Sequence, residues 1–358
     1  MISIIYPYRN RNLKSVRNSL NSLKIQENSD FHVFFVDYGS DLTIADQARE
    51  LCESFSFISY RYYPVQNQPW NKSKALNSVI KNLNGGHCFV ADVDMIFHPD
   101  FTKIAEQLQR LETTVYFQVG FLSSRDQTLD KKFSDFKDYR KSTSEATGLS
   151  LLPVSVLKKL RGFDEFYHFW GAEDTDMHIR LKNEGYKVKY YDSEVLMLHQ
   201  WHPSYRCKED KSLTEDLQID GIVQLNHQHL KFAEQFNVTK VNLKGWGEVP
   251  SKEVMQELLD TPVNLELINE KRQIDDLLYG QLPLISGKNL KILIKKDPLL
   301  KSQKYSAKKL LRKKVPIYYS LKEVNDLVLL HLICFYRDKP YYFQVSTSNN
   351  FIEFAIKL

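Results

Sequence analysis

Cysteines are few in this chain of 358 residues, and no two of them form a CxxC pair. They are Cys52, Cys88, Cys207 and Cys334, and their spacing does not suggest a disulfide framework. Small secreted domains that depend on disulfides carry a denser set of cysteines. The sequence therefore fits a protein that folds in a reducing compartment.

Long apolar runs are also missing. The longest, LVLLHLICFY at 327–336, is too short to span a bilayer and contains His331. The N-terminal MISIIYPYRNR enters a strand-like run directly and lacks signal-peptide architecture. We therefore expect a cytoplasmic protein, which can also be peripheral at the inner face of the membrane.

Neither sign of charge is in large excess. The formal net charge of +5 does not by itself indicate a nucleic-acid partner. The charge is uneven, however, because residues 288–314 contain eleven Lys or Arg residues and a single acid, Asp297. This segment is either a solvated surface or a patch that meets an anionic membrane or a phosphate-bearing acceptor.

The first half of the chain alternates between strand-like and helix-like segments. Apolar runs predict strands, and apolar residues at helical spacing predict helices between them. The expected strands are 2–8, 32–40, 57–65 and 88–93, and the expected helices are 12–26, 45–55 and 72–83. This alternation predicts an α/β fold with right-handed βαβ units and a mostly parallel sheet flanked by helices.

The pattern weakens after residue 205. A strand-like segment precedes this point at 188–198, and 216–236 has the pattern of a helix. From about 250 onward only short mixed segments and no motif are evident. We therefore predict a catalytic domain at 1–235 and a C-terminal extension or small second domain at 240–358.

Polar clusters follow three of the expected strands. They are PYRNR after the first strand, DYGSD after the second and DVD after the fourth. Ligands of open α/β sheets bind beyond the carboxyl ends of the strands. One such cluster can be explained by entry into a loop, but three together favour a shared site.

The stretch CFVADVDMIF at 88–97 places two acids, Asp92 and Asp94, between apolar residues. An uncompensated buried carboxylate is costly. Carboxylates at a strand end suit Mg²⁺ or Mn²⁺, which often also hold substrate phosphates. The alternative to a metal site is that the two residues are structural, one as an acid in a loop and the other as a cap.

A second stretch predicts a helix that starts near Gly171 and ends at Gly185. Glu173 and Asp174 fall in its first turn, directly after Trp170. Acids there can simply favour the helix dipole, and Asp176 with Arg180 forms an i,i+4 pair. A carboxylate beside a Trp wall also makes a good general base for a hydroxyl of a stacked sugar.

A third stretch, LHQWHP at 198–203, contains His199 and His202. Two imidazoles at this spacing can reach one metal ion if the segment turns. A single histidine would more often be structural, but here a pair flanks a tryptophan.

Taken together, residues 2–205 resemble the β-1,4-galactosyltransferase family, within the inverting GT-A glycosyltransferases related to glycosyltransferase family 2. Four segments carry the resemblance in the family's order: PYRNR (7–11), NKSKALN (71–77), CFVADVDMI (88–96) and TGLSLLPVSVLKKLRGFDEFYHFWGAEDTD (147–176). The chain departs from the family at Ala172 and Thr175, where the family has Gly and Asp. Residues 240–358 resemble no segment of the family.

The resemblance implies a role for each matching position. Those expected to bind the nucleotide sugar are Pro7, Tyr8, Arg9, Arg11, Asp37, Lys74, Asp92, Val93, Gly148 and Trp170. Asp94, His199 and His202 would hold Mn²⁺ or Mg²⁺. Trp170, Glu173 and Asp174 would bind the acceptor, with Glu173 and Asp174 catalytic and Asp174 the general base.

The resemblance therefore implies a metal-dependent hexosyltransferase that uses a sugar linked to uridine diphosphate (UDP). Galactose or N-acetylgalactosamine leads as the donor sugar, ahead of glucose. The expected acceptor is a saccharide or lipid-linked saccharide of a surface glycan, in polysaccharide biosynthesis. Two alternatives remain open: a nucleotidyltransferase of similar fold, and a glycan-binding protein with a dead site.

Overall fold

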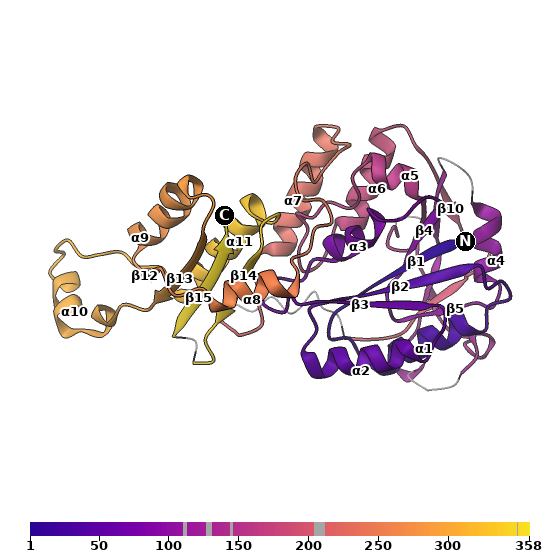
Figure 1. Cartoon of the computed structure of the whole chain (residues 1–358), viewed down its shortest axis with the longest axis horizontal. Helices are drawn as coiled ribbons and strands as arrows, with labels where there is room; N and C mark the ends of the chain where they lie inside the picture. The colour runs from indigo at the N-terminus through magenta and orange to yellow at the C-terminus, as the bar shows by residue number, and fades with distance from the viewer. Residues whose placement is uncertain (110–112, 127–130, 144–145, 204–211, 349) are drawn as a thin grey trace. The chain divides into compact units, whose positions relative to one another are not determined.

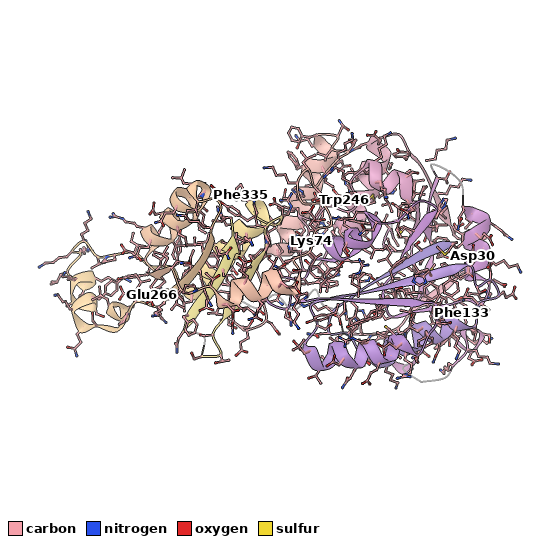
Figure 2. All side chains as sticks on the ribbon, in the orientation of Figure 1. Asp30, Lys74, Phe133, Trp246, Glu266 and Phe335 are labelled. Carbon is pink, nitrogen blue, oxygen red and sulfur yellow. The ribbon has the colours of Figure 1, made fainter. Side chains whose placement is uncertain are left out.

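The computed structural model describes residues 1–109, 113–126, 131–143, 146–203, 212–348 and 350–358 (Figures 1 and 2). The chain divides into two compact units. The first comprises Met1–Gln66, Trp70–Arg206 and Val223–Val249, and the second comprises Asn67–Pro69, Cys207–Ile222 and Pro250–Leu358. Cys52, Cys88 and Cys334 are free thiols, whereas Cys207 lies outside the described residues.

A seven-stranded sheet forms the centre of the first unit, in the order β10-β6-β9-β4-β1-β2-β3. Its strands are β1 (Ile2–Tyr8), β2 (Phe31–Tyr38), β3 (Ile58–Tyr63), β4 (His87–Val90), β6 (Thr113–Phe117), β9 (Ser150–Pro153) and β10 (Lys187–Tyr191). All neighbours pair in parallel except β9, which is antiparallel to both β4 and β6. The predicted α/β fold with a mostly parallel sheet is confirmed, and the antiparallel β9 is an addition to it.

Helices cover both faces of this sheet (Figure 1). They are α1 (Leu13–Lys24), α2 (Leu42–Glu53), α3 (Lys72–Ile80), α4 (Phe101–Leu108), α5 (Val154–Lys159), α6 (Glu173–Asn183) and α7 (Ile222–Gln235). Alternate residues of a strand point to opposite faces. Accordingly, Ile4 of β1 packs in the core with α1, α2 and α4, whereas Ile5 packs in the core with α3, α5 and α6. Both residues are fully buried, which explains the unbroken apolar run of β1.

The strand register brings the expected polar clusters to one edge of the sheet. Tyr8 at the end of β1 pairs with Asp37 of β2, and Ile5 of β1 pairs with Val90, the last residue of β4. The loops after β1, β2 and β4 therefore leave the same edge. The side chain and backbone of Asn10 bond to Ser40 and Asp41, which ties the first two loops together.

A smaller sheet lies next to this edge in the first unit, in the order β5-β11-β7-β8. Its strands are β5 (Met95–Phe97), β7 (Val119–Phe121), β8 (Arg140–Lys141) and β11 (Met197–His199). The segment 188–198, expected as one strand-like stretch, is divided between β10 in the large sheet and β11 in the small one. Apolar periodicity alone does not reveal such a change of sheet, because both strands bury apolar side chains.

The second unit contains a four-stranded sheet in the order β12-β13-β15-β14. Its elements are α8 (Lys252–Asp260), β12 (Leu265–Ile268), α9 (Lys271–Asp275), β13 (Asn289–Lys295), α10 (Gln303–Leu310), α11 (Leu321–Phe335), β14 (Tyr341–Val345) and β15 (Phe351–Lys357). The sequence had indicated only short mixed segments here. Among the described residues, no helix combines the length and apolarity needed to cross a membrane.

Candidate active site

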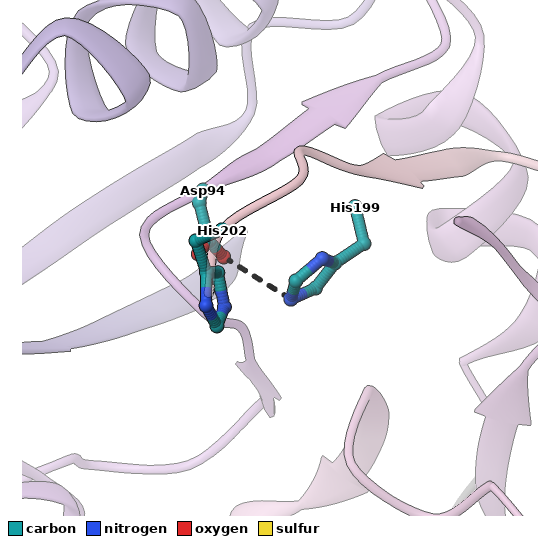
Figure 3. Close-up of side chains that lie close together, drawn as sticks. All are labelled: Asp94, His199 and His202. Carbon is teal, nitrogen blue, oxygen red and sulfur yellow. Dashed lines mark ion pairs between the residues drawn. The ribbon is translucent and has the colours of Figure 1, made fainter. Parts of the chain in front are cut away.

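Asp94, His199 and His202 gather at one point of the sheet edge (Figure 3). The imidazole Nε2 of His199 lies 3.7 Å from Asp94 Oδ1, and that of His202 lies 3.5 Å from Asp94 Oδ2. One donor atom from each of the three residues lies within 4.8 Å of the others. The structure therefore brings together the three residues that the sequence assigned to a metal.

The backbone around this cluster explains why residues a hundred positions apart meet. Strand β11 pairs antiparallel with β5, and this register sets His199 opposite Met95, next to Asp94. Gln200 then clamps the turn, because its backbone N–H and its side-chain Nε2 both donate to the Asp94 carbonyl, each at 3.1 Å. The same Nε2 donates to the Ser15 carbonyl of α1 at 2.9 Å. Gln200 is a positioning residue that the sequence did not reveal.

The donor atoms of this cluster fit a metal ion. Asp94 is 8% exposed, and its Oδ1 is buried without a hydrogen-bond partner in the described structure. The Nδ1 of His202 lies 2.8 Å from the Pro203 carbonyl. A carbonyl can only accept, so Nδ1 carries the proton and Nε2 presents its lone pair to the cluster. One carboxylate and two imidazoles at this spacing can hold a divalent cation.

A second cluster, centred on Lys72 at the start of α3, adjoins the first through Asp92. The ammonium of Lys72 lies 3.1 Å from Asp92 Oδ1 and 3.4 Å from Glu173 Oε1. Burial opposes the charge on both Lys72 and Asp92. Nevertheless, the carboxylates raise the pKa of Lys72, and Lys72 holds the pKa of Asp92 below its usual range. Burial raises the pKa of Glu173, and the neighbouring charge of Asp174 adds to this rise.

Lys72 was missed in the sequence, where Lys74 of the same segment was assigned to the nucleotide sugar. Lys74 is only 5% exposed within α3, and its backbone N–H donates to Oδ1 of Asn71, the N-cap residue of the helix, at 2.8 Å. Its role in donor binding stays a prediction. The only sequence signal for Lys72 was its position. It is the first residue of a predicted helix, and ligands of α/β folds often lie at helix N-termini beyond the carboxyl ends of the strands.

Asp174 stands beside Gly148, close to the Lys72 cluster. Its Oδ1 accepts the Thr175 backbone N–H at 2.8 Å. A Cβ added to Gly148 would lie 3.3 Å from the other oxygen, Oδ2. The antiparallel pairing of Val90 with Ser150 brings the segment that carries Gly148 to the end of β4. The structure thus leaves Oδ2 of Asp174 facing a position where the chain carries no side chain.

The chain enters α6 through a strained turn. Phe169, Gly171 and Ala172 all have positive φ, with values of 63°, 98° and 76°. Ala172 is the N-cap, where a left-handed conformation is unfavourable for a residue with a Cβ. Strain of this kind persists only where the surroundings enforce it, and it is common at functional sites.

Two other helices hold the loop that carries Trp170. The amide Nδ2 of Asn226, fully buried in α7, donates to the carbonyls of His168 and Trp170, each at 3.1 Å. In α3, the Asn77 side chain accepts a hydrogen bond from the Phe163 backbone N–H at 2.9 Å and donates one to the Phe163 carbonyl at 2.7 Å. The segment NKSKALN therefore also supports the Trp170 loop. Asn226 lies in a helix that the sequence predicted without assigning it a role.

The remaining predicted donor-site residues lie at the ends of β1 and β4. Pro7 and Tyr8 are buried in β1, and the Tyr8 hydroxyl donates to the Arg11 carbonyl at 2.9 Å. The Arg9 guanidinium donates to the Gln66 carbonyl. Val93 is buried between Asp92 and Asp94. Their roles toward a nucleotide stay predictions.

Asp37 lies deeper than its predicted role in binding the nucleotide sugar suggests. It is fully buried, with Oδ1 accepting the Ser40 N–H and Oδ2 accepting the Tyr60 hydroxyl, both at 2.9 Å. Burial raises the pKa of Asp37. These contacts shape the loop after β2, and a contact of Asp37 with the nucleotide sugar stays a prediction.

Comparisons with known families cover the part of the chain that carries this site. Residues 3–161 match a family model described as glycosyl transferase family 2, and residues 127–202 match one described as the N-terminal domain of galactosyltransferase. Beta-1,4-galactosyltransferase 5 of Danio rerio is 24% identical over 194 residues, which cover 48% of this chain and 45% of that protein. The Homo sapiens protein of the same name is 24% identical over 193 residues, which cover 49% and 44%. The chain thus spans less than half the length of these relatives.

Among solved structures, a crystal structure of GalNAc-T7 with UDP, GalNAc and Mn²⁺ overlaps 59% of this chain and 46% of its own. The TM-score is 0.44 at 11% identity, so only part of the two backbones superposes. The family matches, in contrast, cover every residue of both clusters. They confirm the resemblance predicted from the motifs: residues 3–202 are similar to glycosyltransferase domains of family 2 and of the galactosyltransferases.

Proposed function

We propose that the chain transfers a hexose from a UDP-sugar to a hydroxyl of a saccharide acceptor, with inversion at the anomeric carbon. The observation that carries this proposal is the meeting of two clusters at one sheet edge. Asp94, His199 and His202 form one, and Lys72 joins Asp92 to Glu173 in the other. The matched relatives make galactose the first donor sugar to test, followed by N-acetylgalactosamine.

For the metal we propose Mn²⁺ ahead of Mg²⁺. Mg²⁺ prefers an all-oxygen shell, whereas two of the three donors here are imidazoles. A bound divalent cation would supply positive charge against the leaving diphosphate. The chain's own contribution is to hold the three donor atoms in place through Gln200 and the pairing of β5 with β11.

Asp174 is the proposed general base. Glu173 is a weaker candidate, because Lys72 engages its carboxylate at 3.4 Å. Asp174 Oδ2, in contrast, faces the side-chain-free position at Gly148. In the proposed step, Asp174 accepts the acceptor hydroxyl proton, the acceptor oxygen bonds to the anomeric carbon, and the bond to UDP breaks. General-base assistance of this kind contributes roughly 10²–10⁴-fold to the rate.

The proposed acceptor is a saccharide. Trp170 beside Glu173 and Asp174 supports a sugar ring as the acceptor. On the basis of the sequence resemblance, we propose that the acceptor belongs to a surface glycan that is built at the cytoplasmic side of a membrane. The nucleotidyltransferase alternative predicts a different product, because it would release pyrophosphate instead of UDP.

The decisive experiment measures UDP release from a panel of UDP-sugars with Mn²⁺, with pyrophosphate assayed in parallel. We expect UDP release that increases with a saccharide acceptor and vanishes with a chelator. Asp174→Asn should lower turnover by at least about 10²-fold while UDP affinity stays nearly unchanged. Asp192→Asn, an exposed acid of the same unit, is the matched control. Full turnover by Asp174→Asn would contradict the assignment of Asp174 as the general base. Release of pyrophosphate without UDP would contradict the proposed hexose transfer.

A further inference from the structure

The second unit carries an exposed tip, formed by residues 297–318 between β13 and α11 (Figure 1). Its helix α10 has eight residues and not one of them is buried. An isolated helix of this length is marginal in water. The tip must therefore be held by other contacts, and its apolar side chains are left without a core to enter.

Two tyrosines and an acid hold the inner side of the tip. The Tyr305 hydroxyl donates to the Pro316 carbonyl at 3.3 Å, and the Tyr318 hydroxyl donates to Asp297 Oδ2 at 2.7 Å. Asp297 Oδ1 accepts the Leu299 N–H at 2.8 Å. The only acid of the tip is thus used in shaping it, and it does not neutralise the outer face.

Aliphatic side chains project from the outer part of the tip. Leu310 is 84% exposed, Leu311 65% and Ile317 69%. Leu310 and Ile317 also border an open groove of about 840 Å³, which Val315 and Pro316 line as well. Single exposed leucines are ordinary, but a cluster of three on one short segment marks an interaction surface.

Basic residues flank these aliphatic residues along the chain. Six of them are exposed: Lys304, Lys308, Lys309, Arg312, Lys313 and Lys314. Within the described residues, none of the six forms an ion pair with an acid. Their charge is therefore available to an anionic partner, on the same short segment as the exposed aliphatic side chains.

We propose that the tip docks onto an anionic membrane surface, with Leu310, Leu311 and Ile317 entering below the headgroups and the six cations at the lipid phosphates. A basic face with aliphatic side chains is the pattern of interfacial membrane segments. A nucleic acid would leave the leucines exposed to water, and a protein interface would be depleted in lysine. This proposal does not depend on the proposed sugar transfer, because lipid binding is measured without substrate.

The test is co-sedimentation of the full chain with vesicles of phosphatidylcholine, with and without phosphatidylglycerol. We expect binding only to the anionic vesicles, weakened by salt. Lys308→Glu with Lys309→Glu should reduce partitioning at least about 25-fold, since each basic residue near such a surface contributes roughly five-fold. Leu310→Ser with Leu311→Ser should reduce it by roughly a hundred-fold.

The matched control is Lys252→Glu with Lys339→Glu, which changes the net charge equally on exposed residues of the same unit outside the tip. It should retain partitioning within a few-fold of the unmodified chain. Thermal unfolding should be unchanged in every tip variant, because α10 has no buried residue. Absence of binding to anionic vesicles overturns the proposal, and so does an equal loss in the control pair. Undiminished binding by the leucine variant also overturns it, because that result indicates a polyanion held by charge alone.

Discussion

Replacing Lys72 with Met removes a cation that lies between two carboxylates of the site. In the structure its ammonium contacts Asp92 at 3.1 Å and Glu173 at 3.4 Å. The Lys72 and Glu173 side chains are 18% and 15% exposed, whereas Asp92 is 41% exposed. Lys72→Met would therefore leave two carboxylates facing each other in a site that is partly closed to water.

The expected loss of stability lies between two limits. Breaking a fully buried ion pair costs about 3–5 kcal/mol, and breaking an exposed one costs about 0–1 kcal/mol. Because Asp92 is two-fifths exposed, we expect Lys72→Met to cost about 2 kcal/mol near neutral pH. For a unit of this size, that loss lowers the unfolding temperature by roughly 4–8 °C.

The loss should shrink as the pH falls. Lys72 holds the pKa of Asp92 below its usual range, so their interaction stabilises the fold at neutral pH and weakens once Asp92 protonates. The pKa of Glu173 is raised, so its carboxylate protonates earlier than an ordinary glutamate on acidification. With both carboxylates neutral, the variant no longer carries repelling charges. The gap between the two proteins should begin to narrow as the pH falls from neutrality through the raised pKa of Glu173, and it should close only below the usual range of an aspartate, where Asp92 of the unmodified chain protonates.

Thermal unfolding of both proteins across this pH range measures the effect. The matched control is Lys81→Met at the C-cap of the same helix, which breaks a 4.0 Å contact with the exposed Glu248 and a 3.3 Å hydrogen bond to the Trp246 carbonyl. It should lower the unfolding temperature by at most about 2–4 °C. A cost for Lys72→Met no larger than that of the control, or a gap that widens on acidification, would refute the reasoning.

Three further predictions concern the metal cluster and the loop before α6. Asp94→Asn should lower Mn²⁺ affinity, measured by titration of the free-ion paramagnetic resonance signal, by more than about ten-fold, whereas His227→Gln, exposed on α7, should leave it unchanged. Ala172→Gly should raise the unfolding temperature by about 1–4 °C, since φ is 76° at this position; a decrease would show that the Cβ contacts there outweigh the backbone strain. Asn226→Ala should raise KM for both the acceptor and the nucleotide sugar, because Trp170 is expected to contact both, in contrast to Gln235→Ala at the exposed end of the same helix, and unchanged KM values would contradict a role of Asn226 in holding the Trp170 loop.

The architecture of the first unit was predictable because its signals are local. The apolar run at 2–8 is too short for a typical helix and indicates a strand buried on both faces, and the helical spacing over 12–26 corresponds to α1. The alternation of the two element types then leaves few topologies. The antiparallel β9 was not predictable in this way, because its four buried residues lie between β4 and β6 through pairings that leave no periodic pattern.

Residues that bear chemistry were predictable where their type is unusual for their place. Asp94 after an apolar strand and two histidines around a tryptophan stand out from the sequence, and the structure places them together. Lys72 and Gln200 do not stand out, because a lysine at a helix start and a glutamine in a loop are ordinary surface residues. Only the three-dimensional pairing of β5 with β11, and of α3 with the start of α6, gives them partners.

The polar residues of α3 join the two halves of the candidate site. Lys72 spans from Asp92, at the end of β4, to Glu173, at the start of α6. One and a half turns later, Asn77 bonds to both backbone groups of Phe163, in the loop that leads to Trp170. Buried polar groups with satisfied hydrogen bonds fix one arrangement and penalise others. Movement of the Trp170 loop relative to the strand edge would therefore break ion pairs and hydrogen bonds along α3 together, so this helix fixes the separation between Asp92 and the start of α6.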